Sequence, residues 1–162
     1  IYSNTRDGIE QFLEGSNNSW INTAIYQNGG LGIDIATTAD DNIPTAGYPV
    51  ITSVVRAGGV VTVTGTSDST FSGVSYRTTT VYLFHGGLDP SGYGEGMWPV
   101  GSANTNASGV WRIVSTEGPT PRCYAAYKRV VAFDLIFFDS SDASSEFSRS
   151  TCGPAYVPMV VR

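Results

Sequence analysis

Apolar and polar residues alternate along the chain from about residue 48 onward, and turn-forming residues separate the alternating segments. The clearest segment is Val60–Thr66, in which Val61 and Val63 would point to the same side. It follows Ala57-Gly58-Gly59, a sequence typical of a hairpin turn. Further strands are predicted over residues 48–55, 78–85, 97–103, 110–115, 130–139 and 155–161. Short strands separated by Gly, Asn and Asp predict an antiparallel β-sandwich of the immunoglobulin-like type.

The predicted strand at residues 130–139 is apolar on both of its faces. One face would be formed by Val131, Phe133, Leu135 and Phe137, and the other, interrupted by Asp134, by Val130, Ala132, Ile136 and Phe138. A strand of a two-layer sandwich needs an apolar surface on one side only. We therefore expect its outer face to be covered by the N-terminal segment, by the C-terminal tail or by another subunit.

The N-terminal residues contain a repeat. Ile1-Tyr2-Ser3-Asn4 recurs as Ile25-Tyr26-Gln27-Asn28, and Asp7-Gly8-Ile9-Glu10 is matched by Leu31-Gly32-Ile33-Asp34, both at an offset of 24 residues. This period, with isolated isoleucines and with Asn and Gly at the corners, is typical of one coil of a parallel β-solenoid. Trp20-Ile21-Asn22 is predicted to add a short inward strand. The alternative is a chance similarity within a segment rich in Gly and Asn.

The predicted fold class is therefore all-β. A short N-terminal parallel β-solenoid stub spans residues 1–35, a linker spans 36–47 and the sandwich spans 48–162. Two coils are fewer than the three that a solenoid normally needs, so the first coil requires a cover, either from upstream coils or from another molecule. Because the sequence starts at Ile1 without methionine, we expect a processed segment or one held by neighbours.

Composition favours an exported protein. Only 14% of the residues are charged, and the net charge of −5 argues against binding to nucleic acid or to an anionic membrane surface. No stretch has the length of a membrane span. Cys123 and Cys152, about 30 residues apart, are predicted to form a disulfide, with two buried thiols as the alternative. The triplets beginning at Asn17 and Asn106 are glycosylation sequons, which fit an extracellular surface.

Five motifs follow one another along the chain: Ile25–Ile35, Pro49–Ser53, Thr62–Thr66, the unbroken Asp89–Gly96 (DPSGYGEG) and Ala143–Ser148. In this order they resemble the C-terminal end of secreted bacterial right-handed β-helix surface proteins that carry an appended immunoglobulin-like sandwich. The resemblance implies a secreted or cell-surface protein and no known reaction. Two departures stand out: only two coils are present, and the family's Ala/Thr-rich sixth strand is replaced by a Phe-rich one.

The loop containing Asp89 and Glu95 offers the sharpest candidate site. Two carboxylates fit a Ca²⁺ ion, and the alternative, which we favour, is that Glu95 accepts backbone N–H bonds within a glycine-rich turn. Asp34, Asp40 and Asp41 form a second candidate Ca²⁺ cluster. No cofactor other than Ca²⁺ is expected.

Catalysis is not expected. His85 is the only histidine and lacks a nucleophile-elbow sequence around it. Asp134 and Asp139, taken as five residues apart on one strand, would point to opposite faces and not converge. Four aromatic residues could stack on sugar rings, although packing is the commoner role of aromatic residues in strands: Trp20, Tyr93, Trp98 and Trp111.

These features predict a non-enzymatic extracellular subunit that assembles head to tail with copies of itself into a pilus-like filament. The alternative is a C-terminal adhesive or carbohydrate-binding module of a larger secreted β-helix protein. The predicted contact residues lie at two ends, one comprising Ile1, Tyr2 and Ile9, and the other Val130, Ala132, Ile136 and Phe138.

Overall fold

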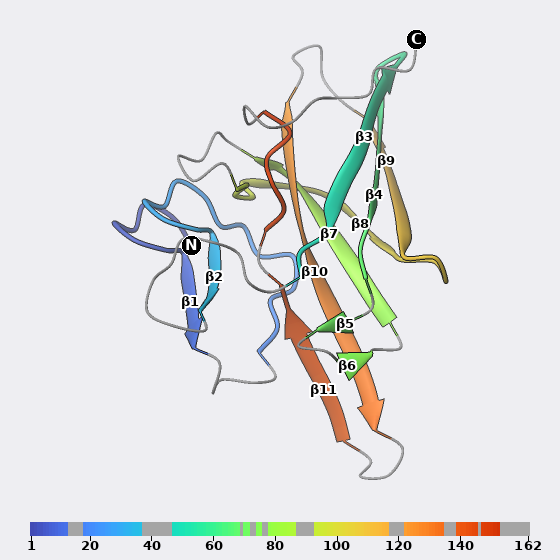
Figure 1. The fold of residues 1–162 in the computed structure, drawn as a ribbon. Coiled ribbons are helices and arrows are strands. Elements are labelled where there is room, and N and C mark those ends of the chain that lie inside the picture. Colours follow the sequence, from blue (N-terminus) through green and yellow to red (C-terminus); the bar gives the residue numbers. More distant parts are fainter. Residues whose placement is uncertain are drawn as a thin grey trace.

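The structure is a computed structural model, and strands and loops account for all the residues that it describes. Those residues are 1–12, 18–36, 47–68, 70–71, 74–75, 78–86, 93–116, 122–134, 139–145 and 147–152. The prediction of an all-β chain is confirmed for them (Figure 1). They contain no helix that is long and apolar enough to cross a membrane. The strands are β1 Ile9–Phe12, β2 Ile33–Ala36, β3 Val50–Ala57, β4 Val60–Thr66, β5 Thr70–Phe71, β6 Val74–Ser75, β7 Thr78–Gly86, β8 Trp98–Asn104, β9 Val110–Thr116, β10 Cys123–Asp134 and β11 Asp139–Ser144.

Two antiparallel sheets form a sandwich-like core. One sheet has the order β11-β10-β7-β8 and the other β3-β4-β9. The side chains between them come from alternate positions of each strand, as a sheet with one face in the core requires. Val61 and Val63 are among them, as predicted. The buried members of this core are Ile51, Val61, Val63, Val81, Leu83, Trp111, Ile113, Tyr124 and Ala126.

The β3–β4 hairpin follows the sequence prediction closely. Gly58 and Gly59 both have positive φ, at 58° and 76°, which a tight two-residue hairpin turn requires. The turn between β8 and β9 uses Gly109 at φ 74°, and the Asn106 side chain accepts hydrogen bonds from the Ser108 and Val110 amides, both at 2.9 Å. Local turn chemistry therefore fixes both connections.

The N-terminal segment packs against the outside of the four-stranded sheet. Ile25, Ile33 and Ile35 form a second buried cluster with Tyr82 and Phe84 of β7 and with Ala125 and Tyr127 of β10. Consequently β7 and β10 bury both of their faces, one in the sandwich core and one beneath the N-terminal segment. Of the three covers considered from the sequence, the N-terminal segment lies on this sheet, where Phe147 joins the same cluster, and the C-terminal tail from residue 153 lies outside the described residues (Figure 1).

The prediction for residues 130–139 was wrong. The strand begins seven residues earlier, at Cys123, and ends at Asp134, and a new strand, β11, begins at Asp139 and turns back along it. Val130 is completely buried within the chain, so its side chain is not available to a neighbouring molecule. The inward strand predicted at Trp20-Ile21-Asn22 is also absent, and Ile21 is exposed. The predicted strand at 155–161 lies outside the described residues.

The predicted disulfide is confirmed. Cys123 at the start of β10 is bonded to Cys152, 29 residues later. Between them, residues 145 and 147–151 run beside β10, where Ser145, Ser148 and Thr151 donate their amides to main-chain oxygens of that strand. The bond therefore closes a segment that already pairs with β10.

Candidate functional site: the open N-terminal layer

The sequence repeat corresponds to physical stacking. We call residues 1–12 the first layer and residues 25–36 the second layer. β1 and β2 pair in parallel with Ile9 opposite Ile33, and Tyr2 forms a parallel bridge with Tyr26, both at the offset of 24 residues. The two tyrosine rings stack with their centroids 5.2 Å apart and their planes nearly parallel. The residues that match in sequence are thus the residues that touch.

Asparagine side chains link the layers in the same register. Asn28 Oδ1 accepts both the backbone amide of Asn4, at 3.2 Å, and its side-chain amide, at 2.9 Å. Glu95 Oε1 then accepts the same two donors of Asn28, at 3.0 and 2.8 Å. The Glu95 carboxylate therefore occupies the position that an asparagine of a third layer would take, and because it has no donor it ends the ladder.

The main chain next to Glu95 closes the second layer in the same way. Gly96 forms an antiparallel bridge with Ile25 and accepts its amide at 2.7 Å. A side chain at Gly96 would place its Cβ 2.6 Å from the ring of Phe84, so the close approach depends on glycine. The side of the second layer that faces away from the first layer is therefore occupied by the chain's own 93–96 segment.

The first layer is open on its outer side. Ile1 and Tyr2 are 48% and 62% exposed, although their counterparts Ile25 and Tyr26 are more buried. Asn4 is exposed, and within the described residues nothing donates to its Oδ1. Asn28 Oδ1 binds the first layer by accepting hydrogen bonds from Asn4. Asn4 Oδ1 is the equivalent acceptor of the first layer, and no further layer of the described chain donates to it. This open layer is the candidate site for association.

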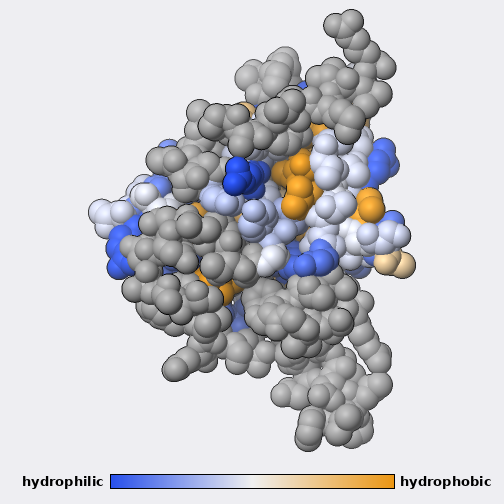
Figure 2. All heavy atoms as spheres, viewed as in Figure 1, coloured by the Kyte–Doolittle hydropathy of each residue, from blue (hydrophilic) through white to orange (hydrophobic). Residues whose placement is uncertain are grey.

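The other exposed apolar side chains of the described surface lie mainly on the sandwich strands. In the view of Figure 2 the coloured surface is mostly hydrophilic or intermediate, with hydrophobic residues confined to small patches. Apart from residues of the first layer and Ile21, the exposed large apolar side chains are Val50, Val55, Val60, Trp98 and Val114, all on sandwich strands.

The structure places the other predicted contact residues differently. Ile9 is half-buried in the first layer and packs against the second buried cluster. Ala132 lies in β10 opposite Ser141. Ile136 and Phe138 lie outside the described residues. Of the two predicted contact ends, the structure therefore brings together Ile1, Tyr2 and Ile9.

The candidate Ca²⁺ residues are only partly described. Glu95 is buried and both of its oxygens accept the Asn28 amide, at 3.0 and 3.3 Å, which agrees with the favoured role of Glu95 as an acceptor of backbone N–H bonds. Asp34 is completely buried in β2. Asp89, Asp40 and Asp41 lie outside the described residues, as does the sequon at Asn17. Asn106 is exposed in its turn, where a glycan would meet no obstruction from the core.

Of the candidate catalytic and sugar-stacking residues, the structure brings together only the carboxylate pair within the described residues. Asp134 and Asp139 are cross-strand partners in the β10–β11 hairpin, so the expectation that they lie apart on one strand was wrong. His85 packs its ring against Tyr124. Trp111 is fully buried in the core, and Trp98 is 58% exposed on β8. Trp98 is thus better placed than Trp111 to stack on a sugar ring.

Tyr127 connects the N-terminal segment to the sheet. Its ring stacks near Tyr82 and Phe84, with centroids 5.3 and 5.5 Å away, and its hydroxyl oxygen accepts the backbone amide of Thr23 at 3.2 Å. Burial raises the pKa of Tyr127 to about 12, and the bond from Thr23 only partly offsets this. The folded chain therefore disfavours the Tyr127 phenolate.

This pKa predicts a loss of stability in alkali. The contribution of Tyr127 is fully present below its ordinary pKa of 10, and it is lost as the pH rises towards 12 because the unfolded chain releases the proton first. We expect it to fall by about 2–3 kcal/mol across that window. Urea denaturation in that range should show the fall for the wild type and a shallower one for Tyr127→Phe. Equal slopes in the two proteins would contradict the assignment.

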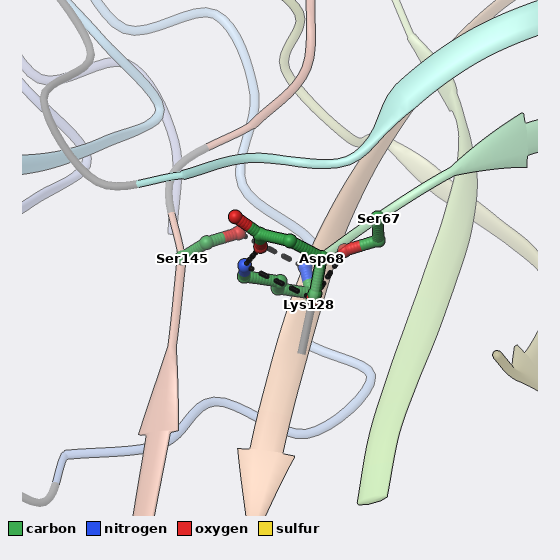
Figure 3. A network of polar contacts seen from close by, with 4 residues as sticks. All are labelled: Ser67, Asp68, Lys128 and Ser145. Atoms are coloured by element: carbon green, nitrogen blue, oxygen red, sulfur yellow. Dashed lines mark hydrogen bonds and ion pairs between the residues drawn. The ribbon is translucent and has the colours of Figure 1, made fainter. Parts of the chain in front are cut away.

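Lys128 is a site that the sequence interpretation missed. It is the only lysine of the chain, and it is completely buried in β10. Its ammonium contacts Asp68 Oδ1, and burial lowers its pKa in spite of that carboxylate (Figure 3). The available signal was compositional, since a lone lysine next to Tyr127 in an apolar segment is unusual for a residue type that normally lies at the surface.

The chain matches no protein-family model. It matches no curated protein either. Evidence on function therefore comes from the contacts within the chain. The chief observation is the pair of stacked layers, in which the outer side of the second layer is closed and the outer side of the first layer is open.

Proposed function

We propose that the chain is a non-enzymatic structural subunit of an extracellular, pilus-like filament that assembles head to tail. The observation that carries this proposal is the open first layer: the Tyr2 ring and Asn4 Oδ1 are the counterparts of the Tyr26 ring and Asn28 Oδ1, which join the second layer to the first, and no described residue donates to Asn4 Oδ1. The two layers are then a β-solenoid stub that continues across the contact between subunits, and the antiparallel sheets are an immunoglobulin-like sandwich.

The contact would reuse the chemistry of the existing layers. A strand of the neighbour would extend the edge of β1, an aromatic ring would stack on Tyr2, and an amide donor would reach Asn4 Oδ1, as Tyr2 and Asn4 do towards the second layer. Because the 93–96 segment blocks the other side, the surface that receives differs from the surface that docks. Such a heterologous contact, if it does not close into a ring, generates a filament.

Sedimentation velocity over a concentration series tests this proposal. The wild type is expected to associate, and Tyr2→Ser to weaken association about tenfold, which corresponds to roughly 1.4 kcal/mol from a lost ring stack and its buried area. Trp98→Ser is the matched control, since Trp98 is about as exposed as Tyr2 but lies on β8. A monomeric wild type, or equal weakening by the two variants, would contradict the proposal.

A second candidate function is favoured by the closed side of the stub. Glu95 and Gly96 end the layered stacking in the manner of a cap, which suits the terminal adhesive module of a larger secreted β-helix protein. In that case the first layer would be covered by further coils and the sandwich would carry the ligand. Binding to a glycan array that is lost in Trp98→Ala, with a monomeric protein, would favour this candidate over the filament.

A further inference from the structure

The environment of Lys128 is that of a reactive amine more than that of a surface cation. Its side chain has no exposed area, and its Nζ contacts Asp68 Oδ1 and lies 3.5 Å from the Asp68 main-chain oxygen. Lys128 belongs to the four-stranded sheet, whereas Asp68 follows β4 of the three-stranded sheet. Figure 3 shows the two side chains meeting end to end across the gap between these strands.

Ser145 holds the main chain of Lys128 in place. The backbone amide of Lys128 donates to Ser145 Oγ at 3.0 Å, and the Ser145 amide donates to the Lys128 carbonyl at 2.8 Å. Gly47 lies close to the pair. A Cβ added at Gly47 would be 3.4 Å from Asp68 Oδ2 and 3.5 Å from Lys128 Nζ. Two groups fixed at contact distance react as if at very high concentration, which offsets much of the entropic cost of forming a bond between them.

We propose that Lys128 and Asp68 form an intramolecular isopeptide bond that joins the two sheets of the sandwich. This inference does not depend on the filament proposal, because the pair lies within one chain and away from the first layer.

The reaction is a condensation that needs no oxidant or cofactor. The ion pair first transfers one proton from Lys128 Nζ to the Asp68 carboxylate, which gives a neutral amine and a carboxylic acid. The nitrogen lone pair then attacks Asp68 Cγ, the bond from Cγ to the hydroxyl oxygen breaks, and that oxygen leaves as water with one proton from nitrogen. The product is a secondary amide, and the mass of the chain falls by one water molecule.

Burial supplies the driving force for the first step. An ammonium without solvent is costly, and burial lowers the pKa of Lys128, which makes loss of its proton easier than from an exposed lysine. The side chain of Asp68 is 56% exposed, so the released water has a path to solvent. The amide would also replace a buried charge by a neutral group of similar shape.

Mass spectrometry of the intact, denatured and reduced wild-type chain tests the proposal. We expect a mass lower than that of the sequence by one water molecule. Trypsin should then release a branched peptide in which residues 57–77 are joined to residues 123–129, because an acylated Lys128 is no longer cleaved. An amine-reactive label should modify only the N-terminal amine of the denatured chain, since Lys128 is the sole lysine.

Two variants complete the test. Asp68→Ala is expected to have its full mass and to take a second label at Lys128, and these readouts hold whether or not the variant folds. Glu10→Ala, which removes an exposed carboxylate on β1, should retain the link. A wild-type chain of full mass would overturn the proposal. So would a loss of water without the branched peptide, since that result indicates a cyclised aspartate instead.

Discussion

Replacing Trp111 with alanine is expected to lower the free energy of unfolding by about 3–5 kcal/mol. Trp111 is fully buried in β9 at the centre of the sandwich core. Its ring lies directly against Gly65 of β4, where an added Cβ would be 2.3 Å from ring atom Cζ2. The ring therefore explains why a glycine stands at this position of β4. Removal of the ring leaves a cavity that the two sheets cannot easily fill.

Trp98→Ala is the matched control for this prediction. Trp98 also lies in a sandwich strand, but it is largely exposed, so its truncation should change stability by less than about 0.5 kcal/mol. Chemical denaturation of both variants gives the comparison. If Trp111→Ala does not fold, Trp111→Phe keeps most of the packing and should show a smaller loss. Equal effects at the two tryptophans would mean that the core is not where the structure places it.

Removal of the Glu95 carboxylate is expected to lower the stability of the N-terminal segment strongly, because Glu95 binds Asn28 of the second layer. Glu95→Ala leaves the backbone amide and the side-chain amide of Asn28 without this acceptor in a buried position. An unsatisfied buried donor costs about 1–3 kcal/mol, so the two together predict a loss of about 2–6 kcal/mol. The loss should fall first on the stacking of the two layers against the sheet.

Hydrogen exchange of the second layer, together with denaturation, measures this effect locally. Exchange at residues 25–35 should accelerate in Glu95→Ala more than exchange in β4, which lies in the other sheet. Glu95→Gln keeps one acceptor oxygen and should lose less. Glu10→Ala serves as the control, because Glu10 forms only a surface ion pair with Arg6 at 3.6 Å, worth at most about 1 kcal/mol. Similar exchange in Glu95→Ala and Glu10→Ala would contradict the role of Glu95 as the end of the ladder.

Sequence patterns predicted the parts of the fold that local rules control. The β3–β4 hairpin has one face in the core, two glycines at its turn and clean alternation, so Val60–Thr66 was predicted residue for residue. The 24-residue offset of the repeat likewise recurs in the parallel pairing of β1 with β2. In both cases the information lies in residues close in sequence or identical in pattern.

The errors in the strand predictions arose where tertiary contacts override the alternation of apolar and polar residues. β10 buries both faces, so its apolar residues do not alternate, and Lys128 and Arg129 in its middle made the first half of the strand look polar. The β10–β11 turn then went unrecognised, which placed Asp134 and Asp139 on one strand. The partner of Glu95 is 67 residues away in the chain, so only the structure could identify it as Asn28.

Electron microscopy of the purified chain at high concentration tests the central claim most directly. The account predicts filaments in which a strand of one subunit continues the parallel stack on β1, with an aromatic side chain over Tyr2 and an amide donor at Asn4, and it predicts that Tyr2→Ser abolishes or shortens them. Dispersed single particles of the wild type at every concentration, or filaments whose subunits leave the first layer uncovered, would contradict it.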